Sequence, residues 1–491
     1  MPLNSQFVLG AGSDGQAVGQ PLRLANRHGL IAGATGTGKT VTLQRLIETF
    51  SDAGVAVFAA DVKGDLCGLG AAGAPRGKVA ERIASMPWLN HQPQAYPVTL
   101  WDVHGQSGHP LRTTLSEMGP LLLGALLELT DSQQAALYAA FKVADREGLL
   151  LLDLKDLKAL LGYLKDNPQV LGEDSALFTS ASAQALLRRL AGLEQQGAEA
   201  LFGEPALQLE DLLHPDRDGR GRVHLLDASR LVHEAPKVYA TFLLWLLAEL
   251  FEQLPERGDA DKPVLALFFD EAHLLFQGTP KALQERLEQV VRLIRSKGVG
   301  VYFVTQSPSD LPDDVLAQLG LRIQHGLRAF TAKEQKALRA VADGFRPNPA
   351  FSALSVLTEL GIGEALVGTL EEKGTPAMVQ RVAIAPPQSR IGPLNEAERA
   401  ALVRQSPLAG RYDKPVDRES AYELLTARAE QARNVEPVEP AEKRKAEPGL
   451  GDMASDLIGS AMKSALRQAA NQIGRQLVRG LMGSLTGSRK R

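Results

Sequence analysis

The chain has 491 residues, of which 44% are hydrophobic and 23% are charged, and its formal net charge is −3. This composition excludes a mainly disordered chain, and the charge excludes a uniformly basic nucleic-acid-binding protein. The single cysteine, Cys67, excludes an internal disulfide and a zinc site built from cysteines. The longest apolar stretches, 118–129 and 240–251, are too short to span a bilayer, and no secretory signal is visible, so we expect a cytoplasmic protein.

Apolar strands alternate with helices over much of the chain. A Gly-rich start leaves room for a hairpin, and buried strands are then predicted at 28–32 and 55–60, with a helix at 39–51 between them. Further strands are predicted at 97–103, 222–227, 264–269, 299–305, 321–327, 364–370 and 377–384, and further helices at 238–254 and 281–296. Strands that are apolar throughout and alternate with helices form parallel sheets covered on both faces, so the pattern predicts an α/β fold.

Changes in composition divide the chain into five predicted segments. Residues 1–109 and 216–385 are expected to form the two halves of the α/β core. Residues 110–215 have helical periodicity and almost no strand signal, which predicts an all-α insertion. Residues 386–450 are rich in proline and charge and predict a flexible linker with room for two short helices, and 451–491 form a tail.

The tail at 451–491 is basic and amphipathic. It carries seven basic and two acidic residues, a net charge of +5, and its apolar residues recur at helical spacing. Its glycines weaken helix propensity, so we expect its order to depend on a partner. Three interpretations stay open, namely an arm on DNA, a helix at an anionic membrane surface and packing on the protein itself; of the two external partners, DNA is favoured.

Residues 33–40 match the phosphate-binding motif G-x-x-x-x-G-K-[ST], known as Walker A, between a predicted strand and a predicted helix. Glycines let backbone N–H groups curl around a phosphate, and the N-terminus of the following helix attracts the same anion. Lys39 would add a positive charge near the β- and γ-phosphates, and the Thr40 hydroxyl would ligate Mg²⁺. The residues expected to contact the nucleotide are Gly33, Ala34, Thr35, Gly36, Thr37, Gly38, Lys39, Thr40 and Val41. A chance Gly-rich turn is the weaker interpretation.

Two carboxylates follow the buried strand at 264–269, in the manner of a Walker B motif. Ligands of open parallel sheets bind at the carboxyl ends of the strands, where Asp270 could hold Mg²⁺ and Glu271 could act as the general base toward water. The alternative is structural, with Asp270 as a helix N-cap and Glu271 as an acid of the first turn. That alternative leaves the upstream phosphate loop unexplained, so we favour the catalytic role.

Polar residues also follow two other predicted strands. Gln306 comes after the strand at 299–305, and its amide could contact the γ-phosphate or the attacking water; a simple strand-ending turn is an equal alternative. Residues 61–65, Asp-Val-Lys-Gly-Asp, follow the second strand and could contact the nucleotide or a neighbouring subunit. Taken in isolation they favour a solvated turn.

In this order the motifs resemble the HerA/FtsK-type branch of P-loop ATPases, which are ring-forming motors that translocate DNA, and among them the YjgR group of HerA-like ATPases. The resembling stretches are 28–40, 57–65, 223–229, 268–273 and 294–308. The resemblance implies a RecA-like P-loop NTPase core with a mostly parallel sheet, an all-α insertion and a flexible C-terminal extension. It further implies ATP and Mg²⁺ as cofactors and a homo-oligomer, favoured as a hexamer, with ATP at the subunit interfaces.

The resemblance also implies an arginine finger supplied by a neighbouring subunit. Arg295 matches the position that the related conjugative motors use, just before the strand at 299–305. Arg322, which lies at the start of the next predicted strand, is a second candidate. Either arginine would stabilise the charge that develops on the γ-phosphate. A surface or inter-helix arginine is the alternative for both.

These expectations combine into one predicted function, Mg²⁺-dependent ATP hydrolysis by a ring motor that translocates on DNA or remodels it, as a helicase would. Two alternatives stay open. One is an ATPase ring that acts on protein or at the membrane surface. The other is a nucleotide-gated scaffold that hydrolyses slowly and has no activity on DNA.

Overall fold

The computed structural model describes residues 6–258, 260–277, 281–329 and 331–434. These residues divide into two compact units. The described residues up to Thr113 and from Glu194 to Val416 belong to the first unit, and the remainder belong to the second. The tail predicted at 451–491 lies outside the described residues, and the five-segment division of the chain stays a prediction.

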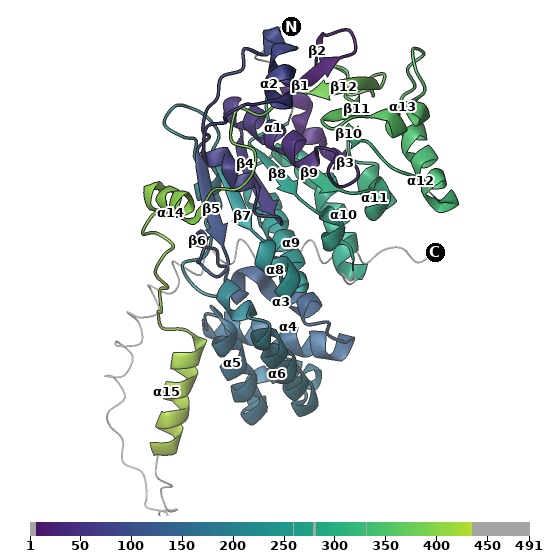
Figure 1. The fold of residues 1–491 in the computed structure, drawn as a ribbon. Coiled ribbons are helices and arrows are strands. Elements are labelled where there is room, and N and C mark those ends of the chain that lie inside the picture. Colours follow the sequence, from purple (N-terminus) through teal and green to yellow (C-terminus); the bar gives the residue numbers. More distant parts are fainter. Residues whose placement is uncertain (1–5, 259, 278–280, 330, 435–491) are drawn as a thin grey trace, which may run out of the picture. The chain divides into compact units, whose positions relative to one another are not determined.

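The first unit is built on a sheet whose described strands number twelve, in the order β2-β1-β12-β11-β10-β3-β9-β8-β4-β7-β5-β6 (Figure 1). The strands are β1 (Gln6–Gly12), β2 (Ala17–Pro21), β3 (Gly29–Ala32), β4 (Ala56–Asp61), β5 (Val98–Asp102), β6 (His109–Pro110), β7 (Val223–Asp227), β8 (Leu265–Phe269), β9 (Val299–Thr305), β10 (Leu321–His325), β11 (Glu364–Gly368) and β12 (Gln380–Ile384). All neighbours from β10 to β6 pair in parallel, whereas β11, β12, β1 and β2 pair antiparallel. The mostly parallel sheet confirms the predicted fold class.

Helices flank the sheet of the first unit. They are α1 (Lys39–Asp52), α2 (Lys78–Ala84), α7 (Leu209–Leu213), α8 (Ser229–Glu234), α9 (Pro236–Gln253), α10 (Lys281–Ile294), α11 (Asp313–Leu316), α12 (Ala332–Asp343), α13 (Ala353–Glu359) and α14 (Glu396–Gln405). The apolar face of α1 buries Phe50 against Phe268 of β8 and Tyr302 of β9, with ring centroids 5.9 and 5.4 Å away. On the other side of the same two strands, Phe269 packs on Phe303 at 5.8 Å. Both faces of the central strands are therefore buried, which explains why their sequences are apolar throughout.

The second unit is helical in its described part. Its helices are α3 (Leu115–Leu126), α4 (Asp131–Glu147), α5 (Leu154–Asp166), α6 (Ser180–Gln195) and α15 (Ala421–Asn434). The Asp153 carboxylate caps α5 by accepting hydrogen bonds from two backbone N–H groups of its first turn. Helix α15 packs on α5, where the Tyr422 N–H donates to Asp156 at 3.0 Å and Lys155 forms an ion pair with Glu423 at 3.4 Å.

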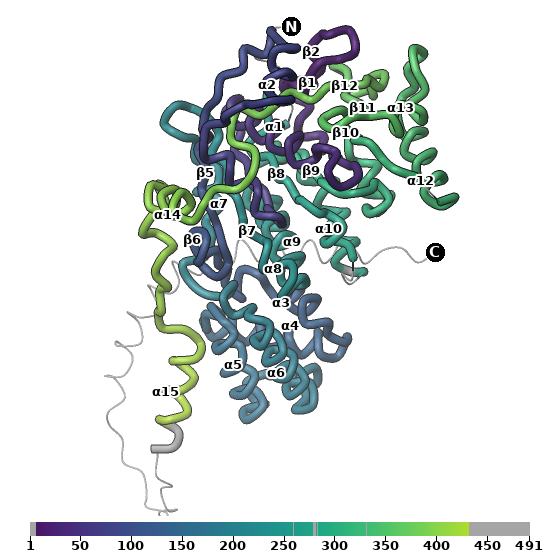
Figure 2. Tube along the Cα trace, in the orientation of Figure 1, coloured from purple at the N-terminus to yellow at the C-terminus, as the bar shows by residue number. Residues whose placement is uncertain are grey.

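The described part of the segment predicted as a linker contains the helices α14 and α15 (Figure 2) and contacts other parts of the chain. In the first unit, the backbone N–H groups of Gln388 and Ser389 donate to the buried Glu48 carboxylate of α1 at 2.9 and 2.8 Å. Further along, Leu394 and Tyr412 are buried, and α15 belongs to the second unit. The described part of this segment holds two helices, for which the prediction left room, and it docks through a few spaced apolar side chains and one buried carboxylate, which composition over a window does not reveal.

No helix in the described ranges is both long and apolar enough to cross a membrane.

Candidate functional site

The candidate site lies at the carboxyl edge of four neighbouring parallel strands, β3, β9, β8 and β4. The register pairs Ala32 with Thr305 across β3 and β9, and Phe269 with Ala60 across β8 and β4. Each strand therefore ends at about the same level, and the polar residues that follow all leave from one edge. The phosphate loop, Gln306, the acidic pair and the loop at 61–65 are brought together in this way.

The phosphate loop joins β3 to α1 and depends on glycine at three positions. Gly33, Gly36 and Gly38 have φ values of 154°, 78° and 109°, which side chains with a Cβ rarely adopt. The Ala34 N–H donates to the Gly326 carbonyl after β10 at 3.1 Å, and the Thr37 carbonyl accepts from the Gly363 N–H at 3.0 Å. The loop is thus fixed from two sides before any ligand is present.

The Lys39 side chain folds back over this loop. Its ammonium donates to the Gly33 carbonyl at 2.6 Å and to the Ala34 carbonyl at 3.2 Å. Burial, followed by the charge of Lys63, lowers its pKa from the ordinary value. The buried Lys39 ammonium, held by carbonyl groups, thus lies beside the loop where it could bind an anion, as the motif predicts.

Asp270 and Glu271 follow β8, and both are at least nine-tenths buried. Burial raises the pKa of Asp270 to about 6, against the opposing charge of Lys63. The Glu271 N–H donates to Asp270 Oδ1 at 2.9 Å. Glu271 itself adopts the left-handed conformation, with φ 46° and ψ 50°. Such a backbone costs roughly 1–2 kcal/mol for a residue with a Cβ, and strain of this kind concentrates at functional sites.

Sequence reasoning missed Lys63. Its ammonium lies 2.8 Å from Glu271 Oε1 and 3.8 Å from Asp270 Oδ2. Burial raises the pKa of Glu271, but the hydrogen bond and charge of Lys63 outweigh it, so that this pKa is lowered. Lys63 lies in an exposed turn, as favoured for 61–65, but its ion pair ties it to the acidic pair. A lysine two residues beyond an aspartate that ends a buried strand was the available signal, but nothing in the sequence indicated that β4 and β8 are neighbours.

The other oxygen of Glu271, Oε2, is buried beside His273. Among the described residues no group hydrogen-bonds Glu271 Oε2, although His273 Nδ1 lies 3.4 Å away. A carboxylate that has one oxygen held by a cation keeps its second oxygen as a proton acceptor, as a general base requires.

Gln306 is exposed directly after β9, between the phosphate loop and the acidic pair. The turn that follows is closed by Asp310, whose Oδ2 accepts from the Thr305 hydroxyl at 2.7 Å and from the Ser307 N–H at 2.9 Å. The strand-ending turn is therefore present, and it leaves Gln306 at the edge of the site; a contact of its amide with the γ-phosphate or the attacking water stays a prediction.

The two candidate arginine fingers lie at the opposite, amino edge of the sheet. Arg295 precedes β9, and its carbonyl accepts from the Asn26 side chain at 3.2 Å. Arg322 lies in β10 and donates to the carbonyls of Leu316 and Gly344, both at 3.1 Å. Neither is near the phosphate loop of its own chain, as a residue that acts on a neighbouring subunit requires. The backbone contacts of Arg322 favour a structural role for it.

The residues present fit ATP with Mg²⁺. The loop offers N–H groups, and no atom lies within 4 Å of where a Cβ of Gly36 would stand. The raised pKa of Asp270 indicates a buried carboxylate whose charge a divalent cation would stabilise. Within the described ranges no cluster of three His, Cys, Asp or Glu could hold a metal alone. Asp270 and Thr40 would therefore hold Mg²⁺ together with phosphate oxygens.

Comparisons with known proteins agree with this geometry. A family model described as helicase HerA-like C-terminal matches residues 6–491. Among solved structures, the unbound bacterial conjugative coupling protein TrwB is similar, with a TM-score of 0.52 and 15% identity over 78% of this chain and 90% of that one. TrwB with ADP and Mg²⁺ matches at 0.51 and 17% over 76% of this chain and 89% of that one. No curated protein sequence matches. The likeness confirms the RecA-like P-loop fold.

The close packing of the phosphate loop predicts unequal effects of two matched substitutions. A Cβ on Gly33 would stand 2.5 Å from that of His325, whereas a Cβ on Gly36 meets nothing. Gly36→Ala should cost only the left-handed backbone, about 1–2 kcal/mol, and Gly33→Ala about 1–3 kcal/mol more through overpacking. Urea unfolding of the ligand-free proteins measures both. Equal losses would contradict the described position of the loop.

Proposed function

Because the chain belongs to the helicase HerA-like C-terminal family, we propose that it is a Mg²⁺-dependent ATPase that works as a ring motor on DNA. The observation that carries the ATPase activity is the convergence of the phosphate loop with Asp270 and Glu271 at one sheet edge. TrwB structures in complex with the ATP analogue ADPNP and with ADP and Mg²⁺ support these ligands for the shared fold.

In this proposal each residue at the edge has one task. The loop N–H groups and Lys39 bind the phosphates, and Thr40 and Asp270 orient the metal. Glu271 accepts a proton from the attacking water at Oε2, and the Gln306 amide orients that water. Bound Mg²⁺-ATP supplies the scissile γ-phosphoryl group and part of the charge neutralisation.

We assign the missing positive charge to Arg295 of a neighbouring subunit. The ion pair of Lys63 with Glu271 and the carbonyl contacts of Lys39 already engage these two lysines, and the charge that develops on the γ-phosphate calls for a further cation. Arg295 at the amino edge would meet the carboxyl edge of the next subunit in a head-to-tail ring. This arrangement supports a closed homo-oligomer, which we propose is a hexamer.

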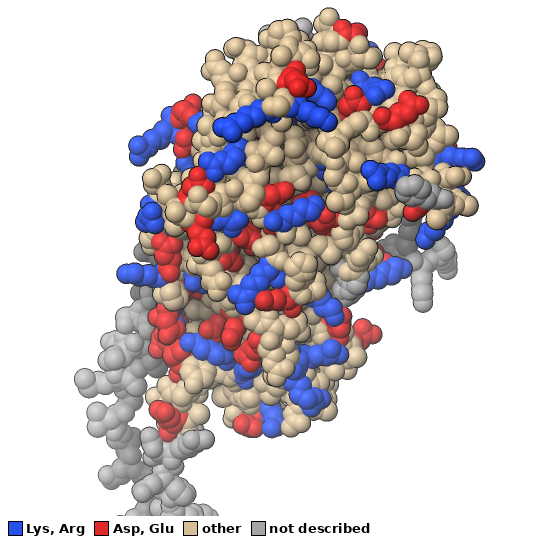
Figure 3. All heavy atoms as spheres, viewed as in Figure 1, with Lys and Arg blue, Asp and Glu red and all other residues tan. Residues whose placement is uncertain are grey.

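DNA is the proposed partner of the ring. On the face shown in Figure 3, lysine and arginine are interspersed with aspartate and glutamate, without one continuous basic surface. Binding to a polyanion would therefore use a local surface, such as the ring channel or the basic tail at 451–491. A ring acting on protein or at the membrane, and a slow nucleotide-gated scaffold, are the competing functions.

Hydrolysis is tested by Lys39→Ala and Glu271→Gln. We expect Lys39→Ala to lose nucleotide binding and turnover, because it removes the cation that holds the phosphates. Glu271→Gln should bind ATP normally and hydrolyse it at least about a hundredfold more slowly, the usual effect of losing a general base. Nucleotide titration and phosphate release measure the two properties. Near-normal turnover by either folded variant would refute the proposed chemistry.

The shared active site is tested by mixing subunits. Arg295→Ala and Glu271→Gln proteins should each be inactive, but mixed rings should recover partial turnover, since some interfaces combine an intact Glu271 with an intact Arg295. Co-assembly is checked by native mass measurement of differently tagged chains. Absence of recovery at every mixing ratio, despite co-assembly, would remove Arg295 from the reaction.

The partner is tested by ATPase rate with and without duplex or single-stranded DNA. A DNA motor should turn over several-fold faster with DNA, and the stimulation should fall as salt rises because phosphate contacts release counterions. Anionic vesicles serve as the control polyanion. Stimulation by vesicles alone would favour the membrane function, and slow turnover insensitive to both would favour the scaffold.

A further inference from the structure

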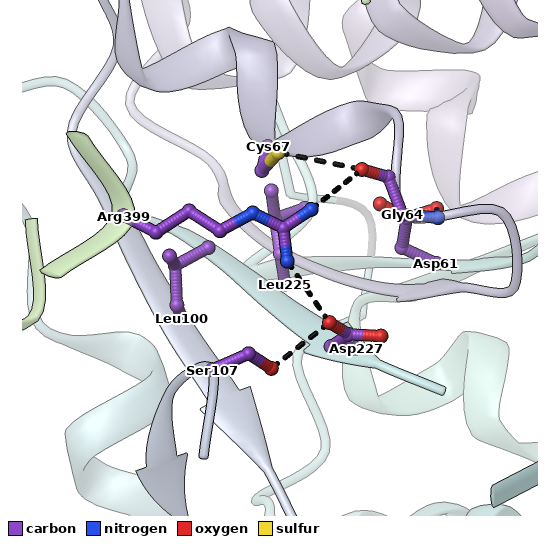
Figure 4. Close-up of a pocket in the computed structure, with 8 residues that line it drawn as sticks. All are labelled: Asp61, Gly64, Cys67, Leu100, Ser107, Leu225, Asp227 and Arg399. Carbon is purple, nitrogen blue, oxygen red and sulfur yellow. Dashed lines mark hydrogen bonds and ion pairs between the residues drawn. The ribbon is translucent and has the colours of Figure 1, made fainter. Parts of the chain in front are cut away.

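The loop that carries Lys63 is anchored at both of its ends. Asp61 accepts hydrogen bonds from the backbone N–H groups of Gly64 at 2.7 Å and Leu66 at 2.9 Å. On the outside, Arg399 of α14 donates to the Gly64 carbonyl at 3.0 Å (Figure 4). The loop is therefore set by side chains and not by solvent.

Arg399 is itself held in place. Its second nitrogen contacts Oδ2 of Asp227, the last residue of β7, at 3.1 Å, and the Ser107 hydroxyl donates to the same carboxylate at 2.9 Å. These groups line a small pocket between the carboxyl ends of β4, β7 and β5, with Arg399 crossing it (Figure 4). A guanidinium that bridges a carboxylate and a carbonyl fixes both its distance and its orientation. Thus α14, from the segment predicted as a linker, reaches the loop next to the catalytic edge.

At the other side of the loop, Lys63 contacts only one of the two carboxylate oxygens of Glu271. The ammonium holds Oε1 at 2.8 Å, and Oε2 is buried without a hydrogen-bond partner among the described residues. An unrestrained glutamate side chain rotates about three bonds, so one held oxygen sets the direction of the other. On the following turn, His273 Nδ1 lies 3.4 Å from Oε2, so the carboxylate lies between Lys63 and His273.

We propose that Lys63 is a positioning residue for Glu271, and that Arg399 maintains this position by clamping the loop at Gly64. The inference rests on the proposed hydrolysis and names two residues outside its catalytic set. It differs from a phosphate-binding role, in which Lys63 would leave Glu271 and contact the nucleotide directly. It also differs from a stabilising role, because the Lys63 side chain is 41% exposed and an ion pair of that exposure contributes little to folding.

The primary test compares Lys63→Ala, Lys63→Met and Lys63→Arg. Alanine and methionine should lower kcat at least about tenfold while Kd for ATP and for ADP stays within about twofold. Arginine, which keeps the charge and a donor, should recover much of the loss. Methionine keeps the apolar stem, and thermal unfolding of each variant confirms that it is folded. An unchanged or increased kcat, or a Kd for ATP that weakens in step with kcat, would overturn the proposal.

A double-mutant cycle locates the effect at Glu271. If Lys63 acts through that carboxylate, Lys63→Ala should cause no further loss in the Glu271→Gln background. Additive losses would show an independent role and overturn the positioning. One outcome would refute only this inference: the unmodified chain hydrolyses ATP, Glu271→Gln abolishes that hydrolysis, and Lys63→Ala turns over normally. Failure of the unmodified chain to hydrolyse ATP would refute it together with the proposed function.

The contact of Arg399 with Gly64 is tested by substituting two arginines of α14, Arg399 and Arg404. Arg399→Ala should lower kcat about threefold or more with nucleotide affinity unchanged, and Arg399→Lys should recover part of it. Arg404→Ala, on the same helix and exposed, is the control and should behave as the unmodified protein. Equal effects of Arg399→Ala and Arg404→Ala would show that α14 does not act on the loop through this contact.

Discussion

Parallel pairing of β3, β9, β8 and β4 is the constraint on which the site depends. Because the four strands run in one direction and in register, whatever follows each of them emerges at the same edge. A phosphate loop, an amide, two carboxylates and a lysine come from positions up to 273 residues apart, yet they need no further device to meet. The aromatic packing of Phe50, Phe268 and Tyr302 holds these strands under α1, so the core and the site share one cause.

Most of this core could be predicted because local signals were strong. Uninterrupted apolar runs marked the central strands, and the glycines of the phosphate loop needed no knowledge of neighbours. Strand order was another matter, since periodicity says nothing about which strands pair. For that reason the contact of Lys63 with Glu271 could not be predicted, because the sequence around Lys63 indicates only a turn. The docking of Gln388 and Ser389 on Glu48 was equally hidden, because it depends on a single buried carboxylate.

Buried carboxyl groups at the edge that carries the site have raised pKa values. Burial raises the pKa of Asp61 to about 7 and that of Asp270 to about 6, and Lys63 and Lys39 are the cations closest to the acidic pair in the described chain. Burial makes the charged form of these carboxyl groups costly, and a bound cation would stabilise that charge and lower their pKa again. The carboxylates of this edge are therefore placed to stabilise a bound cation.

The left-handed backbone of Glu271 sets stability and chemistry against each other at one position. Glycine or asparagine would relieve roughly 1–2 kcal/mol of strain there, and neither can act as a base. A laboratory selection for heat resistance alone would favour that substitution and yield a protein that is more stable but inactive. Engineering for stability must therefore keep Glu271 and substitute other positions, because the strained backbone carries the carboxylate that the proposed reaction needs.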